Sequence, residues 1–175
     1  MPGKTVATMA LVAAAVLPGT ATPAGSVDII RYDNPEQAPG FALEDVTGQE
    51  RSLEDFEGRA LVVNFWATWC APCVRELPAL ERLHADPDGP ATDVVAIAVN
   101  QWAVDIEEFL EAREEISLSF TLLPDPDGVA TDAWAVGTLP TTFILDAQGR
   151  VHYKVVGDPD WDGDEMRERI AGVKQ

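Results

Sequence analysis

The residues with the clearest chemical potential are the two cysteines of the chain, Cys70 and Cys73, which are separated by two residues. A disulfide between them would close too small a loop to restrict the unfolded chain much, so the pair is poorly placed to act as a structural staple. The same spacing suits a dithiol that is oxidised and reduced in turn. We therefore expect the Cys70–Cys73 disulfide to be the redox-active group, with no further cofactor and no metal.

The position of the pair assigns a different role to each sulfur. An apolar run over residues 60–66 ends just before the cysteines, and a helical pattern begins just after Cys70. Free backbone N–H groups and the helix dipole at such a helix start stabilise an anion, and a thiolate is an anion. We expect Cys70 to have a lowered pKa and to be the nucleophile, whereas Cys73, one turn further in, is shielded and resolves the mixed disulfide.

The neighbours of the cysteines suit an accessible thiol. Pro72 falls in the first helical turn, where its missing N–H would have had no partner, and it stiffens the loop. Ala71 is small and uncharged, so it leaves the nucleophile open to a substrate. Trp69 is expected to shield the site and to contact the substrate, whereas Trp66, on the preceding strand, fits either that role or the core.

The elements that must position the pair alternate between strands and helices. Apolar runs predict strands, and apolar residues at helical spacing predict helices, the first of which contains Pro78 as an expected kink. The order predicts an α/β fold with a mixed central sheet flanked by helices. The expected strands are 60–66, 94–99, 120–123, 141–145 and 151–156, and the expected helices are 72–84, 104–115, 129–135 and one around 166–173.

The N-terminal part divides into three segments. Residues 1–24 contain Lys4 and then an apolar stretch followed by small residues and turn formers, which is typical of a signal peptide, with an uncleaved anchor as the alternative. Residues 25–40 are expected to form an exposed, extended lead-in. The domain proper is expected over 41–175, beginning with a hairpin that turns near Gly48 and a capping box at Ser52.

Composition excludes several partners. The chain has 175 residues, 30 of them acidic and 12 basic, for a formal net charge of −18. Such a surface repels phosphate backbones and anionic lipid headgroups, so nucleic acid is not an expected partner, and a membrane is expected only if the N-terminal segment stays uncleaved. A basic protein partner would be attracted, although acidity is also a common route to solubility.

Three sequence segments resemble thioredoxin-like proteins of the TlpA, ResA and CcmG type. They are the run from Asn64 to Cys73, the pair Glu76 and Pro78, and the run from Leu139 to Asp146. The resemblance extends from about Phe41 to the last predicted helix and implies a thioredoxin-like fold. The N-terminal hairpin and the additional helix and strand over about 104–123 fit this group better than plain thioredoxin.

The resemblance implies a second element of the site at Pro140. Related proteins hold this proline in the cis form beside the cysteine pair, and a cis X-Pro bond is uncommon. Leu139 would then present backbone groups to an incoming peptide, which docks briefly as an extra strand next to Cys70. Without the cysteine motif, the same residues would indicate a plain turn before a strand.

One position departs from thioredoxin itself, which carries a buried aspartate where this chain has Asn64. An amide cannot act as a base, so the proton released when Cys73 attacks must go elsewhere. Glu76 lies three residues past Cys73, on the same helix face, and matches a glutamate that influences cysteine acidity in related proteins. The alternative for Glu76 is a solvated side chain in the first turns of a helix.

Together these features predict an exported, periplasmic thiol-disulfide oxidoreductase, anchored to the inner membrane only if its N-terminal segment is uncleaved. Reduced Cys70 would attack a disulfide of a periplasmic protein, and a membrane thiol donor would re-reduce the enzyme. By resemblance, the expected protein substrates are cysteine pairs of apocytochrome c awaiting haem, or metal-site cysteines.

Other uses of the same sulfurs remain open. A disulfide oxidase or isomerase would run the exchange in the other direction, and a chaperone could hold Cu(I) between the two thiolates. Haem attachment would require a histidine where Val74 stands, and zinc would need both histidines at unsuitable spacings. A thiol peroxidase is disfavoured because neither a threonine nor a serine precedes either cysteine by three residues.

Overall fold

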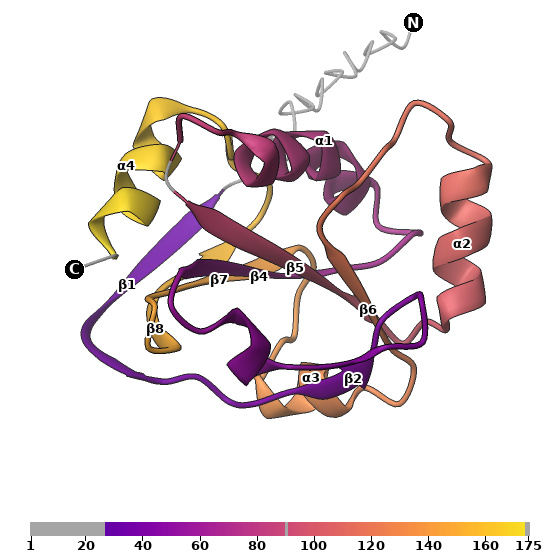
Figure 1. Ribbon diagram of the computed structural model, residues 1–175, viewed down its shortest axis with the longest axis horizontal. Coiled ribbons are helices and arrows are strands. Elements are labelled where there is room, and N and C mark those ends of the chain that lie inside the picture. The colour runs from indigo at the N-terminus through magenta and orange to yellow at the C-terminus, as the bar shows by residue number, and fades with distance from the viewer. Residues whose placement is uncertain (1–26, 90, 174–175) are drawn as a thin grey trace, which may run out of the picture.

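The computed structural model describes residues 27–89 and 91–173, which form a twisted sheet with helices on both faces (Figure 1). The six-stranded sheet has the order β1-β8-β7-β4-β5-β6. Strands β4, β5 and β6 are parallel, whereas the pairs β4–β7, β7–β8 and β8–β1 are antiparallel. The strands of this sheet are β1 (Asp28–Gln37), β4 (Ala60–Trp66), β5 (Thr92–Val99), β6 (Thr121–Asp125), β7 (Thr141–Leu145) and β8 (Arg150–Val156).

The helices cover the sheet unequally. Helices α1 (Ala71–Ala85) and α4 (Asp164–Gly172) lie on one face, α2 (Ala103–Glu111) stands beside the β6 edge, and α3 (Val129–Ala133) lies on the other face (Figure 1). The hairpin of β2 (Ala42–Glu44) and β3 (Glu50–Ser52) and the short helix η1 (Leu53–Phe56) also lie on the α3 side. None of the helices in the described part of the chain is long and apolar enough to cross a membrane.

Side-chain alternation on β4 divides the interior into two cores. Val62 and Trp66 belong to the core beneath α1 and α4, whereas Val63 and Phe65 belong to the core beneath α3. Successive residues of a strand point to opposite faces, so every second position meets the same helix layer. Asn64 shares its parity with Val62 and Trp66, which directs its side chain toward the α1 side.

The thioredoxin-like fold class is confirmed, and most predicted elements lie within a few residues of their expected bounds. The hairpin turns at Gly48, whose φ of 81° suits glycine, and the Ser52 N–H donates to Asp55 at 2.8 Å as a capping box requires. Helix α1 continues through Pro78 as one element. Helix α2 ends at Glu111, earlier than expected, where a tight turn carries Arg113 N–H to the Leu110 carbonyl.

The N-terminal lead-in is the main correction. Residues 25–40 were expected outside the domain, but Asp28–Gln37 form β1, which pairs with β8 at one edge of the sheet. The segment is extended and mostly exposed, as predicted, yet its backbone completes the sheet. The expected signal segment, residues 1–24, lies outside the described residues.

Candidate active site

The two cysteines form a disulfide at the start of α1. Their Sγ atoms are 2.09 Å apart and their Cα atoms 5.3 Å apart. Cys70 is the N-cap residue, with extended backbone angles, and its carbonyl accepts the Val74 N–H. Cys70 keeps 7% of its surface exposed, whereas Cys73 is fully buried. Only Cys70 is therefore in reach of a substrate, and it lies where the helix N-terminus stabilises a thiolate.

The loop before Cys70 is fixed by a side chain from the loop that follows β5. Gln101, which is 5% exposed, accepts the Thr68 N–H at 2.8 Å and donates to the Thr68 hydroxyl at 2.7 Å. The neighbouring Trp69 projects outward and is 71% exposed. An anchored backbone thus presents an aromatic surface and one edge of the disulfide to solvent.

An open groove runs beside Cys70, and we call it the Cys70 groove. Four of the five residues expected to contact a substrate, Trp69, Ala71, Pro72 and Leu139, line it together with Cys70. The fifth, Pro140, follows Leu139 in the chain and is buried. The remaining lining residues are Val99, Asn100, Thr131, Asp132, Val136, Gly137 and Thr138.

The peptide bond between Leu139 and Pro140 is cis, as the resemblance implied. The Pro140 carbonyl accepts the Gly157 N–H at 3.0 Å, and the Thr141 hydroxyl donates to the Thr138 carbonyl at 2.7 Å. The first bond ties the segment before β7 to the residue that follows β8, and the second closes a turn within that segment. Leu139 is thereby held at the groove, where its backbone can meet an extended peptide.

Behind the disulfide, Glu76 is buried rather than solvated, with 1% of its surface exposed. Its Oε1 accepts a hydrogen bond from Asn64 Nδ2 at 2.7 Å, and its Oε2 accepts one from Trp161 Nε1 at 2.7 Å. Burial raises the pKa of Glu76 to about 8, although the bonds from Trp161 and Asn64 oppose the rise. This pKa lies close to that of a free thiol, about 8.5, so a proton can pass between the two types of group at little cost.

Asn64 stands where thioredoxin has an aspartate, and its amide donates a hydrogen bond that orients the carboxylate of Glu76. It stands directly across from Thr142 in the β4–β7 pairing, and its Nδ2 also donates to the Thr142 hydroxyl at 2.9 Å. We call Asn64, Glu76, Thr142 and Trp161 the Glu76 cluster. Compared with thioredoxin, the buried titratable group has moved from the strand to the helix, and the strand residue now holds it in place.

Sequence reasoning missed three of the residues that shape the site. Trp161 lies 85 positions from Glu76 along the chain, and nothing in its neighbourhood marks it as a partner. Thr142 and Gln101 could be found only through strand register and loop packing, which a single sequence does not specify. Trp66, for which two roles were open, is a fully buried core residue.

Comparisons with known proteins agree with this geometry. Residues 35–154 match the AhpC/TSA family. The thiol-disulfide oxidoreductase ResA of Geobacillus thermodenitrificans is 35% identical over 137 residues, which cover 78% of this chain and 76% of that protein.

Two solved structures show the same fold. A Chlorobium tepidum structure assigned as thiol:disulfide interchange protein DsbE superposes with a TM-score of 0.71 and 30% identity, covering 81% of this chain and 97% of its own. A secreted thiol-disulfide isomerase from Corynebacterium glutamicum gives a TM-score of 0.70 and 26% identity, covering 87% and 96%. The names of these similar proteins all refer to the exchange of thiols and disulfides.

Proposed function

We propose that this protein reduces disulfides of exported proteins. The premise is that the chain belongs to the AhpC/TSA family and is a thiol-disulfide oxidoreductase related to ResA. The observation that carries the proposal is the asymmetry of the disulfide. Cys70 opens onto a groove beside the cis proline, and Cys73 is sealed behind it. This arrangement suits a nucleophile and a resolving thiol.

The proposed exchange moves two electrons from the dithiol to the substrate. The Cys70 thiolate attacks one sulfur of the substrate disulfide, forms a mixed disulfide and releases the other sulfur as a thiolate. Cys73 then loses its proton and attacks Cys70 Sγ, which forms the Cys70–Cys73 disulfide and releases the second substrate thiolate. The protein leaves oxidised, and a thiol donor must return two electrons before the next turnover.

Glu76 is the proposed acceptor of the Cys73 proton. It follows Cys73 by one helical turn, is shielded from water, and has a pKa raised to about 8 by burial. A base works best when its pKa lies near the working pH. The carboxylate that accepts the proton is held in place through both oxygens by the hydrogen bonds from Asn64 and Trp161.

The proposed substrates are protein disulfides in the periplasm, with apocytochrome c cysteine pairs and metal-site cysteines as the leading classes. The groove beside Leu139 supports a polypeptide substrate, because an extended chain can pair with backbone there. The apolar segment before residue 24 supports export, as does the similarity to a secreted protein. In an oxidising compartment a membrane thiol donor would supply the electrons.

Redox titration against glutathione and dithiothreitol tests the direction of electron flow. A reductant should have a potential well below that of dedicated oxidants, which lie at about −120 mV. A value near that potential would contradict the reductase proposal and favour the oxidase or isomerase alternative.

Kinetics with a disulfide-closed Cys-x-x-Cys-His peptide then tests the substrate class. The reduced protein should reduce this peptide faster than the same peptide lacking histidine if apocytochrome c is the substrate. Tight, stoichiometric Cu(I) retention together with no reduction of either peptide would favour the copper chaperone instead.

A further inference from the structure

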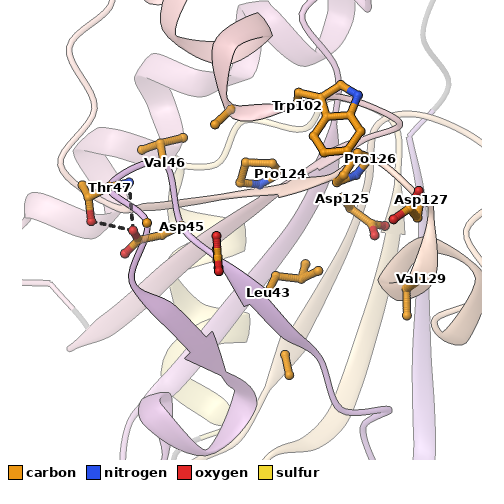
Figure 2. A pocket seen from close by; sticks show the side chains of 14 residues that line it. Leu43, Asp45, Val46, Thr47, Trp102, Pro124, Asp125, Pro126, Asp127 and Val129 are labelled. Carbon is orange, nitrogen blue, oxygen red and sulfur yellow. Dashed lines mark hydrogen bonds between the residues drawn. The ribbon is translucent and has the colours of Figure 1, made fainter.

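A second hollow lies next to the Cys70 groove, at the carboxyl ends of β5 and β6. Figure 2 shows Leu43 of the β2–β3 hairpin on one side of it and Pro124 and Trp102 on other sides. We call it the hairpin hollow. Eight apolar side chains line it: Ala42, Leu43, Val46, Trp102, Ala103, Pro124, Pro126 and Val129.

The walls of the hairpin hollow are held by hydrogen bonds. The Val46 N–H donates to the Leu122 carbonyl of β6 at 3.2 Å, which fixes the hairpin to the sheet edge. The Asn100 N–H donates to the Asp125 carbonyl at 3.0 Å, which fixes the loop that carries Trp102. Because these walls are already ordered, little conformational entropy of the lining segments is lost when a ligand binds.

The hairpin turn and the start of α3 are fixed by two carboxylates. Asp45 accepts the Thr47 N–H at 2.9 Å and the Arg51 Nε at 2.9 Å (Figure 2 shows the Thr47 bonds). Burial would raise the pKa of Asp45, but its hydrogen bonds with Thr47 and Arg51 hold that pKa well below its ordinary value. Asp125 accepts the Thr131 N–H at 2.9 Å and its hydroxyl at 2.7 Å.

Trp102 is an exposed aromatic side chain on this otherwise anchored frame. It is 63% exposed, although its backbone N–H is bonded to Asp105 at 2.7 Å. Val129, which also lines the hollow, is likewise exposed. Large apolar side chains that stay in water beside an anchored hollow are typical of a surface that another polypeptide covers.

Charge specifies the kind of polypeptide. Four acidic residues line the hollow, Glu44, Asp45, Asp125 and Asp127, and none of the described residues that line it is lysine or arginine. Asp45 and Asp125 are engaged in the bonds above, whereas Glu44 and Asp127 are exposed at the rim. An apolar side chain flanked by lysine or arginine would satisfy both the apolar lining and the acidic rim.

The hairpin hollow lies beside the Cys70 groove, because two segments of the chain each contribute residues to both linings. The two segments are 99–103 and 125–132. Asn100 and Thr131 line the Cys70 groove, whereas Trp102 and Val129, two residues away along each segment, line the hairpin hollow. A chain whose disulfide lies on Cys70 can therefore reach the hollow with a nearby segment.

We propose that the hairpin hollow is an exosite for the protein substrate, which takes an apolar side chain from a lysine- or arginine-bearing segment close to the substrate disulfide. This inference rests on the proposed reductase function and adds a substrate class to it. Binding at the exosite raises the rate for protein substrates without contributing to the exchange of sulfurs.

Disulfide-closed peptides that share one Cys-Gly-Gly-Cys ring test the exosite. One carries a Lys-Leu-Trp-Lys tail, one a Glu-Leu-Trp-Glu tail, and one no tail, with Gly-Ser spacers of increasing length between ring and tail. Dithiodipyridine, a small neutral disulfide, reports the chemistry of Cys70 alone. The lysine-tailed peptide should have the highest kcat/KM at one best spacer length, and the advantage should shrink as salt is added.

Variants of the exosite should remove that advantage. Trp102→Ser should lower kcat/KM for the lysine-tailed peptide roughly tenfold, which is the loss expected for one large apolar contact. Replacing Glu44 and Asp127 together by lysine should lower it about threefold to tenfold at low salt. Neither change should alter the rate with dithiodipyridine or with the tail-less peptide.

Control variants lie on β1, at the opposite edge of the sheet. Tyr32→Ser removes an exposed aromatic side chain, and Glu36→Lys reverses an exposed charge. Both should leave the preference for the lysine tail intact. Equal rates with all three tails in the wild-type protein would overturn the exosite, and so would equal losses in the control variants.

Two other outcomes are distinguishable. If the wild-type protein reduces none of the peptides and not even dithiodipyridine, the proposed reductase function fails rather than the exosite.

Sedimentation velocity tests whether a second copy of the chain occupies the hairpin hollow. A wild-type dimer that Trp102→Ser dissociates would replace the exosite by a self-association surface.

Discussion

Cys70 and Cys73 are separated by one helical turn, and that turn separates an open groove from a sealed polar cluster. The Cys70 side is shaped by Trp69 and Leu139, which line the groove and present surface to a polypeptide. On the Cys73 side, Cys73 is fully buried, and Glu76 follows it by three residues on α1 and accepts a buried hydrogen bond at each carboxylate oxygen. The outer surroundings therefore govern which disulfide is attacked, and the inner surroundings govern where the proton goes.

The largest effect should come from removing the inner base. We predict that Glu76→Gln slows the resolving step roughly a hundredfold at pH 7, because Cys73 loses its proton acceptor. The first step, attack by Cys70 on dithiodipyridine, should change little. Stopped-flow kinetics that separate mixed-disulfide formation from its resolution make the measurement.

The control for this variant is Glu36→Gln, an exposed glutamate on β1. It should leave both steps unchanged. Equal slowing of the two steps by Glu76→Gln would show that the substitution disturbs the whole site, and the division between the two sides of the disulfide would be lost.

Glu76 also makes stability depend on pH. The ordinary pKa of 4.5 applies to its carboxyl in the unfolded chain, and burial raises that pKa to about 8 in the fold. Between these values the folded protein keeps a proton that the unfolded chain has lost, so stability falls as pH rises, by at most about 1.4 kcal/mol per pH unit. Below the unfolded-chain pKa the carboxyl is protonated and neutral in both states. The contribution of the raised Glu76 pKa to the free energy of unfolding is then fully present.

Urea unfolding of the oxidised protein between about pH 5 and 9 measures this dependence. Glu76→Gln should flatten the decline in the free energy of unfolding, because the amide does not titrate. The variant is also expected to be less stable at low pH, because its NH2 group faces a hydrogen-bond donor, either Asn64 or Trp161. A wild-type decline that persists unchanged in the variant would place its origin elsewhere.

A smaller effect is expected at Trp161, which positions Glu76 through one hydrogen bond. Trp161→Phe removes the donor to Oε2 and so should raise the pKa of Glu76 further. The resolving step should slow about threefold to tenfold at pH 7, and its pH profile should move to higher pH.

Trp66→Phe is the matched control for this change, because Trp66 is equally buried and its Nε1 has no hydrogen-bond partner among the described residues. The control should lose stability without moving the pH profile. If both variants move the profile alike, packing rather than the Trp161 hydrogen bond sets the acidity of Glu76.

The smallest effect is expected at Gln101, on the outer side. Gln101→Ala removes both bonds to Thr68, so the loop that carries Trp69 and Cys70 should become less ordered. We predict about a twofold to fivefold loss in the rate of the first step and no change in the pH profile of the second. Gln49→Ala, at an exposed turn position, should change neither step.

The outer side of the site was predicted from the sequence better than the inner side. Cys70 and Pro72 were predicted from the local geometry of a helix start. The cis bond before Pro140 was expected from the resemblance to related proteins, because the residues alone indicate a plain turn. Glu76 was placed by its helical spacing from Cys73 together with the resemblance to proteins that carry a glutamate at this position. Its donor Trp161 was not found, because the contact depends on how α1 packs against the segment before α4.

The fold shows the same division. Strands β4 and β5 were predicted from apolar runs because they are covered on both faces. Strand β1 was missed because its side chains are mostly exposed and include Pro35, so no burial pattern marks it. It joins the sheet through backbone hydrogen bonds, which depend little on side-chain identity.

The roles assigned to the two cysteines can be tested most directly by trapping. Cys70→Ala and Cys73→Ala would each be expressed in the native host, and any protein joined to the remaining cysteine identified by mass spectrometry after alkylation. Cys73→Ala should hold substrates on Cys70 as mixed disulfides, and Cys70→Ala should hold none, because Cys73 is sealed. Capture by Cys70→Ala but not by Cys73→Ala would contradict the account and reverse the two roles.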